Sequence, residues 1–143
     1  MEGQLILHFI IEENNLTTAG EASSKVKKRL SQLGILPDII KKVVVPMYEA
    51  ELNAVIHANG GFADVEINKE KIVIILTDKG PGIPDIELAM KEGFSTAPDH
   101  IKNMGFGAGM GLPNMKKYAD ELNIVTEVGV GTSVKLTVYL TKD

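Results

Sequence analysis

Large apolar and β-branched side chains fill residues 4–12, and this composition predicts a first β-strand. The more polar residues that follow predict a helix. Thr17 and Thr18 are suitable N-caps for this helix, and we expect it to run to Leu33. Gly34 then stands where a glycine in the left-handed conformation commonly closes a helix. The chain is therefore expected to begin with a strand followed by a helix.

A second, longer helix is predicted between Pro37 and Ala58. Pro46 lies inside it. Because proline lacks a backbone N–H, we expect Pro46 to kink this helix or to split off its first turns. The Asn-Gly-Gly sequence at residues 59–61 is expected to end the helix.

Two strands are predicted next, over residues 63–68 and 71–78, and the polar turn between them indicates a β-hairpin. Residues 79–111 are rich in glycine and proline, with only a short helical stretch expected near residues 86–91. A segment of that length without regular structure is typical of a lid over a binding site. We place this lid at about residues 92–104.

The C-terminal part predicts one more helix and two more strands. Pro113 suits the first helical position, and we expect the helix to run to about Leu122. Strands are expected over residues 124–128 and 132–140, on either side of a glycine-containing turn. Together the elements predict an α+β fold: a two-layer α/β sandwich with a mixed, largely antiparallel sheet and helices on one face.

The composition narrows the possible functions. A length of 143 residues suits a single domain, residues 1–143. The net charge is −4 and no basic segment is interleaved with aromatic residues, which argues against direct nucleic-acid binding. Because there is no cysteine, disulfides and thiolate metal sites are excluded. The apolar run at residues 5–11 is far shorter than the roughly 20 residues that span a bilayer, and no basic leader precedes it. We therefore expect a cytoplasmic protein without membrane attachment.

Glycine occupies every second position from Gly105 to Gly111, directly before the helix predicted at Pro113. A backbone without Cβ atoms can approach a ligand closely, and the N-terminus of the following helix offers free N–H groups to an anion. This combination is typical of a phosphate site, although loops that are merely flexible share the composition. No Gly-Lys-Ser/Thr sequence is present, the glycines come too late for a dinucleotide fingerprint, and the protein-kinase motifs are missing.

The sequence Thr-Asp-Lys-Gly-Pro-Gly-Ile at residues 77–83 follows the predicted hairpin. The Asp78 carboxylate accepts hydrogen bonds and cannot donate them, so at this strand end it could recognise the amino edge of adenine and discriminate against guanine. An aspartate that only bonds the backbone of its own turn would show the same local pattern.

The long helix carries Glu49, Asn53 and His57 at intervals of four residues. Glu49 and Asn53 are therefore about 40° apart around the helix and project from one face. The amide oxygen of Asn53 suits a hard cation such as magnesium, which also binds substrate phosphates. The carboxylate of Glu49 could deprotonate an attacking hydroxyl or remain an exposed helix charge, whereas His57 is more typical of a packed or capping histidine.

The order of these motifs resembles the GHKL ATPases, a superfamily that includes gyrase, HSP90, sensor histidine kinases and MutL. The matching motifs are Glu-x-x-x-Asn on a helix, Asp-x-Gly-x-Gly-Ile after a strand, a lid, Gly-x-Gly-x-Gly, and the Gly-Val-Gly-Thr sequence at residues 129–132. The resemblance implies that ATP and Mg2+ are the cofactors, with the metal held by Asn53. The nucleotide-binding residues that it implies are Asn53, Asp78, Gly80, Gly82, Ile83, Gly105, Gly107, Gly109, Gly111, Leu112 and Thr132.

Within this superfamily the chain is most similar to the anti-sigma factor kinases and switch kinases of bacterial partner-switching modules. Glu-Ala-x-x-Asn-Ala-x-x-His-Ala at residues 49–58 resembles their helix motif, and Phe94-Ser95-Thr96 resembles their lid motif. Two positions depart from the pattern of these kinases. Leu52 stands where many anti-sigma members carry a threonine before the asparagine, and a proline, Pro46, lies one turn before Glu49. Neither position handles nucleotide.

The resemblance implies a serine/threonine protein kinase in which Glu49 is the catalytic base. Its substrate would be a STAS-domain antagonist protein, with a sigma factor or a phosphatase as a further partner and a homodimer as the expected assembly. The alternative is a non-catalytic module in which ATP orders the lid and thereby controls partner binding. Both functions require the same pocket, and the presence of Glu49 favours the kinase.

Overall fold

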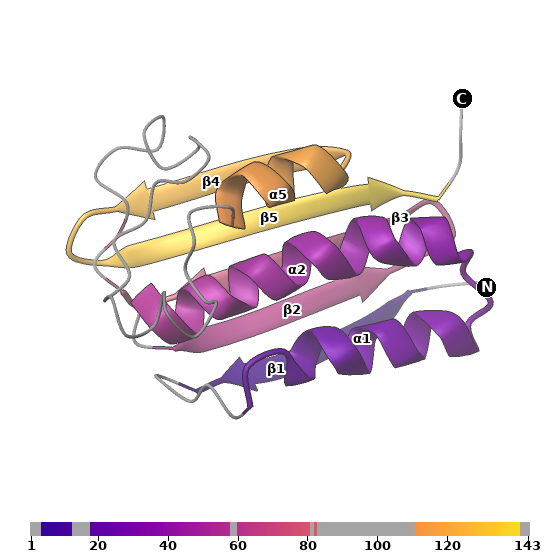
Figure 1. Ribbon diagram of the computed structural model, residues 1–143, viewed down its shortest axis with the longest axis horizontal. Coiled ribbons are helices and arrows are strands. Elements are labelled where there is room, and N and C mark those ends of the chain that lie inside the picture. Colours follow the sequence, from indigo (N-terminus) through magenta and orange to yellow (C-terminus); the bar gives the residue numbers. More distant parts are fainter. Residues whose placement is uncertain (1–3, 13–17, 58–59, 81, 83–110, 141–143) are drawn as a thin grey trace.

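Five antiparallel strands form a single sheet in the computed structural model, which describes residues 4–12, 18–57, 60–80, 82 and 111–140 (Figure 1). Their order across the sheet is β1-β2-β3-β5-β4, and every described strand pair is antiparallel. The strands are β1 (Leu5–Ile11), β2 (Gly61–Ile67), β3 (Lys71–Asp78), β4 (Glu121–Glu127) and β5 (Gly131–Tyr139).

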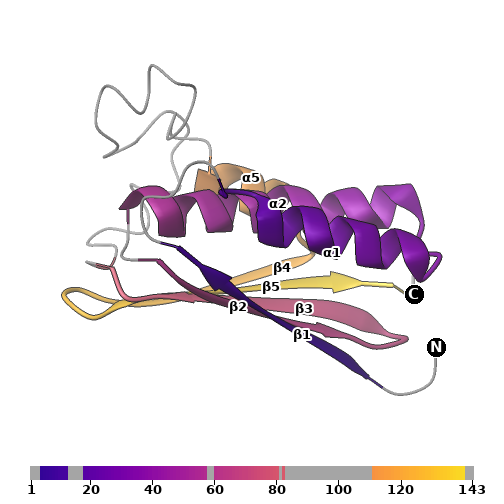
Figure 2. The same cartoon turned by 90° about the horizontal axis from the view of Figure 1, so that it is seen from below.

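All of the described helices lie on the same face of this sheet, as Figure 2 shows edge-on. They are α1 (Glu21–Gln32), α2 (Pro37–His57) and α5 (Gly111–Tyr118), with α2 between the other two (Figure 1). None of the helices in the described part of the chain is both long enough and apolar enough to cross a membrane. The predicted α+β sandwich with helices on one face is confirmed.

The hydrophobic core lies between the helices and the covered face of the sheet. Val26 and Leu30 of α1, Met47 of α2 and Met115 of α5 are fully buried there. They join a core cluster with residues from the sheet, including Val65, Ile74 and Leu136. None of the described helices covers the other face of the sheet, and side chains such as Ile6 and Val125 are exposed.

The start of α1 differs from the prediction. The helix begins at Glu21, with Gly20 at the N-cap in a left-handed conformation and without a capping side chain of its own. The carbonyl of Thr18 accepts a hydrogen bond from the Glu21 N–H, and Thr17 lies outside the described residues. The predicted closure at Gly34 is confirmed by its φ of 77°.

Pro46 does not split the second helix. α2 runs without interruption through Pro46, which is buried. The apolar side chains of Val43, Met47, Ala50 and Ala54 share one face and are all buried against the core. Burial of this face outweighs the backbone hydrogen bond that proline removes, so the predicted split was wrong.

The last helix is shorter than predicted. α5 begins two residues before Pro113 and ends at Tyr118, so Leu122 lies in β4 and pairs with Leu136 of β5. The N–H of Asp120 donates to the carbonyl of Thr137, which ties the chain to the sheet directly after the helix. Residues that were predicted to be helical are therefore paired in the sheet instead.

The Asp120 carboxylate connects α2 and β5 to the turn between α5 and β4. Asp120 lies at the end of the sheet opposite to Asp78, the last residue of β3. Its Oδ1 accepts a hydrogen bond from Nζ of Lys42 on α2 at 2.5 Å, and its Oδ2 accepts one from the N–H of Tyr139 on β5 at 2.8 Å. Partial burial acts to raise the pKa of Asp120. The hydrogen bonds from Lys42 and Tyr139 and the charge of Lys42 outweigh burial and lower this pKa below 3.8.

Because the folded-state pKa is lowered, Asp120 stabilises the fold at pH values above its ordinary pKa, and this contribution is lost as the pH falls through the lowered value. We expect Asp120→Asn to reduce the free energy of unfolding by about 1 kcal/mol or less at neutral pH. The difference from the wild type should shrink as the pH drops below 3.8. Urea unfolding across this range measures it, and a difference that is independent of pH would contradict the assignment.

Candidate functional site

The described part of the predicted site lies at one end of the sheet. Asp78 is the last residue of β3, and Thr132 is the second residue of the neighbouring strand β5. The C-terminal end of α2, which carries Asn53, and the N-terminal end of α5 lie at this same end of the molecule in both views (Figures 1 and 2). The fold thus brings together residues that are far apart in the sequence.

The predicted nucleotide-binding residues are only partly described. The backbone is described at four of the predicted loop and helix positions, namely Gly80, Gly82, Gly111 and Leu112, the last two being the first residues of α5. Outside the described residues lie Ile83, Gly105, Gly107, Gly109, the lid predicted at residues 92–104 and the Phe94-Ser95-Thr96 motif. The roles assigned to the second group stay predictions.

Asp78 has one carboxylate oxygen fixed by two backbone amides. Oδ1 accepts hydrogen bonds from the N–H of Gly80 at 2.9 Å and from the N–H of Thr132 at 3.1 Å. The first is the local turn interaction, and the second connects the end of β3 to the start of β5. Among the described residues no donor contacts Oδ2, so neither of these two hydrogen bonds occupies that oxygen. The turn interaction and ligand recognition are therefore compatible in one side chain.

Thr132 lies directly beside this carboxylate. Its side chain is 7% exposed, and its hydroxyl is 2.9 Å from the hydroxyl of Thr126 on β4. The Thr126 hydroxyl also donates to the carbonyl of Gly131 at 3.3 Å. These contacts hold the start of β5 against β4 and keep the Thr132 N–H aimed at Asp78.

Glycine at the start of β2 permits a close approach of two backbones behind Asp78. Gly61 pairs with Asp78, and a Cβ atom added to Gly61 would lie 1.9 Å from the carbonyl oxygen of Thr77. Backbone atoms cannot rotate away as a side-chain tip can. The present position of the end of β3 therefore requires a residue without a side chain at position 61.

Gly61→Ala is expected to destabilise the fold by about 2 kcal/mol or more and to weaken nucleotide binding through the displaced end of β3. Gly129→Ala is the matched control: Gly129 has a φ of 84°, so alanine is strained there, but apart from its chain neighbours no described residue has an atom within 4 Å of the added Cβ. Urea unfolding of both variants compares the two effects. Equal destabilisation would show that the contact with Thr77 is unimportant.

Glu49 is bonded to the helix that follows the glycine-rich sequence. Its Oε1 accepts a hydrogen bond from Nδ2 of Asn114, at 3.2 Å, and the Glu49 side chain is half-buried. Asn114 lies in the first turn of α5, immediately after Pro113. The sequence analysis did not identify Asn114. Its position directly behind Gly-Leu-Pro, at the N-terminus of a helix predicted to face an anion, was the available signal.

Asn53 is half-buried and lies four residues after Glu49 on α2. The described residues contain no group of three or more histidine, cysteine, aspartate or glutamate side chains that could hold a metal ion. His57 also lies near the end of α2, and its side chain is outside the described residues.

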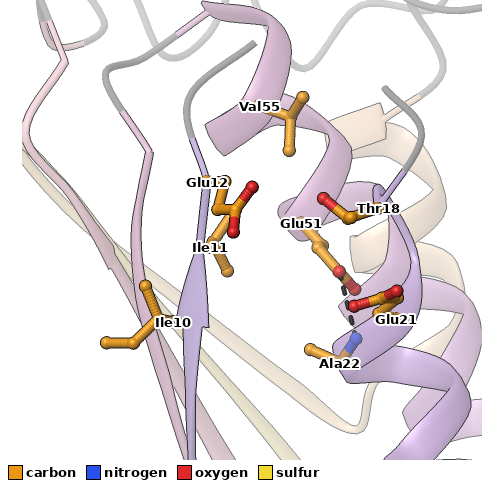
Figure 3. Close-up of a pocket in the computed structure, with 8 residues that line it drawn as sticks. All are labelled: Ile10, Ile11, Glu12, Thr18, Glu21, Ala22, Glu51 and Val55. Atoms are coloured by element: carbon orange, nitrogen blue, oxygen red, sulfur yellow. Dashed lines mark hydrogen bonds between the residues drawn. The ribbon is translucent and has the colours of Figure 1, made fainter. Parts of the chain in front are cut away.

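Glu51 is a buried carboxylate that the sequence analysis did not single out. The residue is 3% exposed, and its side chain points toward the first turn of α1 (Figure 3). It lines a pocket of about 40 Å3 between the end of β1 and the start of α1. This volume suits water and is far below the roughly 300 Å3 of a small-molecule site. None of the residues that line this pocket is among the predicted nucleotide-binding residues.

Comparison with known proteins agrees with the geometry. The family model described as "Histidine kinase-, DNA gyrase B-, and HSP90-like ATPase" matches residues 42–142. The serine/threonine-protein kinase RsbT of Bacillus subtilis is 30% identical over 135 residues, which are 92% of this chain and 93% of that protein. The anti-sigma F factor of Geobacillus stearothermophilus is 34% identical over 148 residues, covering 99% of this chain and 93% of that protein.

A solved structure has the same fold. The RsbU and RsbW domains of Rv1364c from Mycobacterium tuberculosis superimpose with a TM-score of 0.63 at 17% identity, covering 97% of this chain and 33% of that one. The match of the family model extends over most of the chain and includes β3, α5, β5 and α2 from residue 42 onward, the elements that carry the described site. The chain therefore belongs to the family of histidine kinase-, DNA gyrase B- and HSP90-like ATPases.

Proposed function

We propose that this chain is an ATP- and magnesium-dependent serine/threonine protein kinase of the anti-sigma regulatory type, which phosphorylates a STAS-domain antagonist protein. The relatives named as an anti-sigma F factor and as a serine/threonine kinase support the coarse class. The observation that carries the proposal is the hydrogen bond between Glu49 and Asn114. It ties the carboxylate proposed as the base to the first turn of the helix whose N-terminus is proposed to face the phosphates.

In this proposal Asp78 selects the nucleotide. Its second oxygen, Oδ2, accepts a hydrogen bond from the amino group of adenine, while the amides of Gly80 and Thr132 hold Oδ1 in place. A carboxylate presents no donor to the carbonyl of guanine, which gives a preference for ATP over GTP.

The glycine-rich sequence from Gly105 to Gly111 and the N-terminus of α5 are proposed to bind the phosphates through backbone N–H groups. The Asn53 amide oxygen is the protein ligand proposed for Mg2+, which when bound neutralises phosphate charge. These groups position the γ-phosphate and stabilise its charge, and position and charge are most of what phosphoryl transfer requires of a protein.

Glu49 is proposed to accept the proton of a serine or threonine hydroxyl on the partner protein. The hydroxyl oxygen then bonds to the γ-phosphorus as the bond between the γ-phosphorus and the bridging oxygen breaks, and ADP leaves with that oxygen. Asn114 keeps one oxygen of Glu49 in a fixed direction and leaves the other for the proton.

The test is a phosphotransfer assay with each STAS-domain protein encoded in the same genome, read by intact mass after incubation with ATP and Mg2+. We expect one phosphate to be added to one of these proteins, and none when ADP replaces ATP. A nucleotide-dependent complex in which no protein gains phosphate would favour the non-catalytic switch module instead.

A further inference from the structure

Glu51 supplies the N-terminal cap of a helix to which it does not belong. Its Oε2 accepts hydrogen bonds from the N–H of Gly20 at 2.9 Å and of Ala22 at 3.2 Å. Its Oε1 accepts two more from Ser23, from the N–H at 3.1 Å and from the hydroxyl at 2.7 Å. Figure 3 shows the carboxylate of Glu51 facing Ala22 across the gap between α2 and α1. A negative charge at this position also suits the positive end of the α1 dipole.

The start of α1 is shaped to receive this carboxylate. α1 has no side-chain cap of its own, because Gly20 occupies the N-cap position. Gly20 lies so close to α2 that an added Cβ would be 2.8 Å from Cε1 of Tyr48. Tyr48 precedes Glu51 by three residues and therefore shares its face of α2. Two residues of one face of α2 thus lie against the start of α1.

The opposite face of α2 carries the groups proposed to act on ATP. Glu51 follows Glu49 by two residues and precedes Asn53 by two, so it is about 160° from each around the helix. Consistent with this, Glu49 bonds to α5, whereas Glu51 bonds to α1. The two flanking helices lie on either side of α2 (Figure 1). The rotation of α2 about its axis is therefore fixed from both sides.

Pro46 makes it important that neighbouring helices fix the rotation of α2. Proline has no N–H to donate to the carbonyl of Lys42, so α2 lacks one of its own hydrogen bonds one turn before Glu49. The C-terminal half of α2, with Glu49 and Asn53, is thus less firmly held by the helix itself than an unbroken helix would be. Glu51, five residues after Pro46, is anchored by four hydrogen bonds just beyond this weak point.

We propose that Glu51 is a positioning residue, which holds the C-terminal half of α2 in the rotation that directs Glu49 and Asn53 toward the nucleotide. This inference rests on the proposed function, since it concerns the residues assigned to the base and to Mg2+. Asp78 is supported by β3 and β5 and not by Glu51, so adenine recognition should be independent of this anchor.

Glu51→Gln tests the proposal with little change in volume. The amide nitrogen of glutamine is a donor and would face N–H donors of α1, so the hydrogen bonds that join α1 to α2 should weaken. We expect kcat for phosphotransfer to fall about tenfold or more. We also expect the gain in ATP affinity on adding Mg2+, measured by calorimetry, to be lost, while the affinity without Mg2+ is retained.

Leu30→Ala is the matched control. Leu30 is a fully buried residue of α1, so this variant lowers stability and weakens the packing of the same helix with the Glu51 hydrogen bonds in place. It should retain both kcat and the Mg2+-dependent affinity at temperatures where it is folded. Equal losses in Leu30→Ala and Glu51→Gln, or no loss in Glu51→Gln, would overturn the proposal.

Ser23→Ala gives a second route if Glu51→Gln does not fold. It removes one of the four hydrogen bonds, that of the Ser23 hydroxyl, and should reduce the Mg2+-dependent affinity partly, by about threefold. An unchanged value would overturn the proposal. The calorimetric measurement needs no protein substrate, so failure to find a phosphorylated STAS protein would count against the proposed function and leave the role of Glu51 decided separately.

Discussion

Glu49→Gln is expected to retain ATP and to lose phosphotransfer. The substitution preserves the size of the side chain and an oxygen that can accept the hydrogen bond from Asn114, so the contact between α2 and α5 should survive. The amide cannot take a proton from a hydroxyl. Loss of a general base typically lowers a rate by about 10²- to 10⁴-fold. The rate of phosphate addition, followed by intact mass, is the measurement, and calorimetric titration with ATP checks that binding is unchanged.

Glu66→Gln is the control for the lost charge. Glu66 is a half-buried glutamate of β2. It lies near the other end of the strand from Gly61, which pairs with Asp78, and no catalytic role is assigned to it. It should transfer phosphate at the wild-type rate. If Glu49→Gln also transferred at that rate, Glu49 would be a structural partner of Asn114 and the base would have to be sought elsewhere.

The sheet and the order of its elements could be predicted from the sequence because local signals were strong. The predicted strand at residues 71–78 agrees with β3, and the left-handed glycine that ends α1 agrees with Gly34. Both depend on residues that are neighbours in the sequence. The errors occurred where the deciding contact is distant in the sequence. Leu122 belongs to β4 because it pairs with Leu136, and α2 continues past Pro46 because its apolar face packs against the core.

The candidate site shows the same division. The sequence placed Asp78 at a strand end and Glu49 and Asn53 on one helix face, since both conclusions follow from spacing alone. It could not reveal that Glu51 caps α1, because the bonded residues are separated by 28 to 31 positions and the nearby threonines offered a local cap. A carboxylate that satisfies distant backbone amides has no periodic signature in the sequence.

Asp78→Asn is expected to weaken ATP binding by about tenfold to a hundredfold. The oxygen that remains can still accept the hydrogen bonds of Gly80 and Thr132, so the turn after β3 should persist. The second atom becomes an NH2 group, which would face the amino group of adenine donor to donor. The same NH2 group can donate to the carbonyl of guanine, so the preference for ATP over GTP should collapse. Calorimetric titrations with both nucleotides measure the two effects.

The change in preference separates recognition from folding. A variant that merely destabilised the end of β3 would weaken ATP and GTP binding together, whereas loss of a specific contact changes their ratio. Asp64→Asn is the matched control, because Asp64 lies on the neighbouring strand β2 and pairs with His8, away from the predicted site. It should leave both affinities unchanged. If Asp78→Asn kept the wild-type ATP affinity and preference, Asp78 would be a turn residue only, and adenine would have to be recognised by other groups.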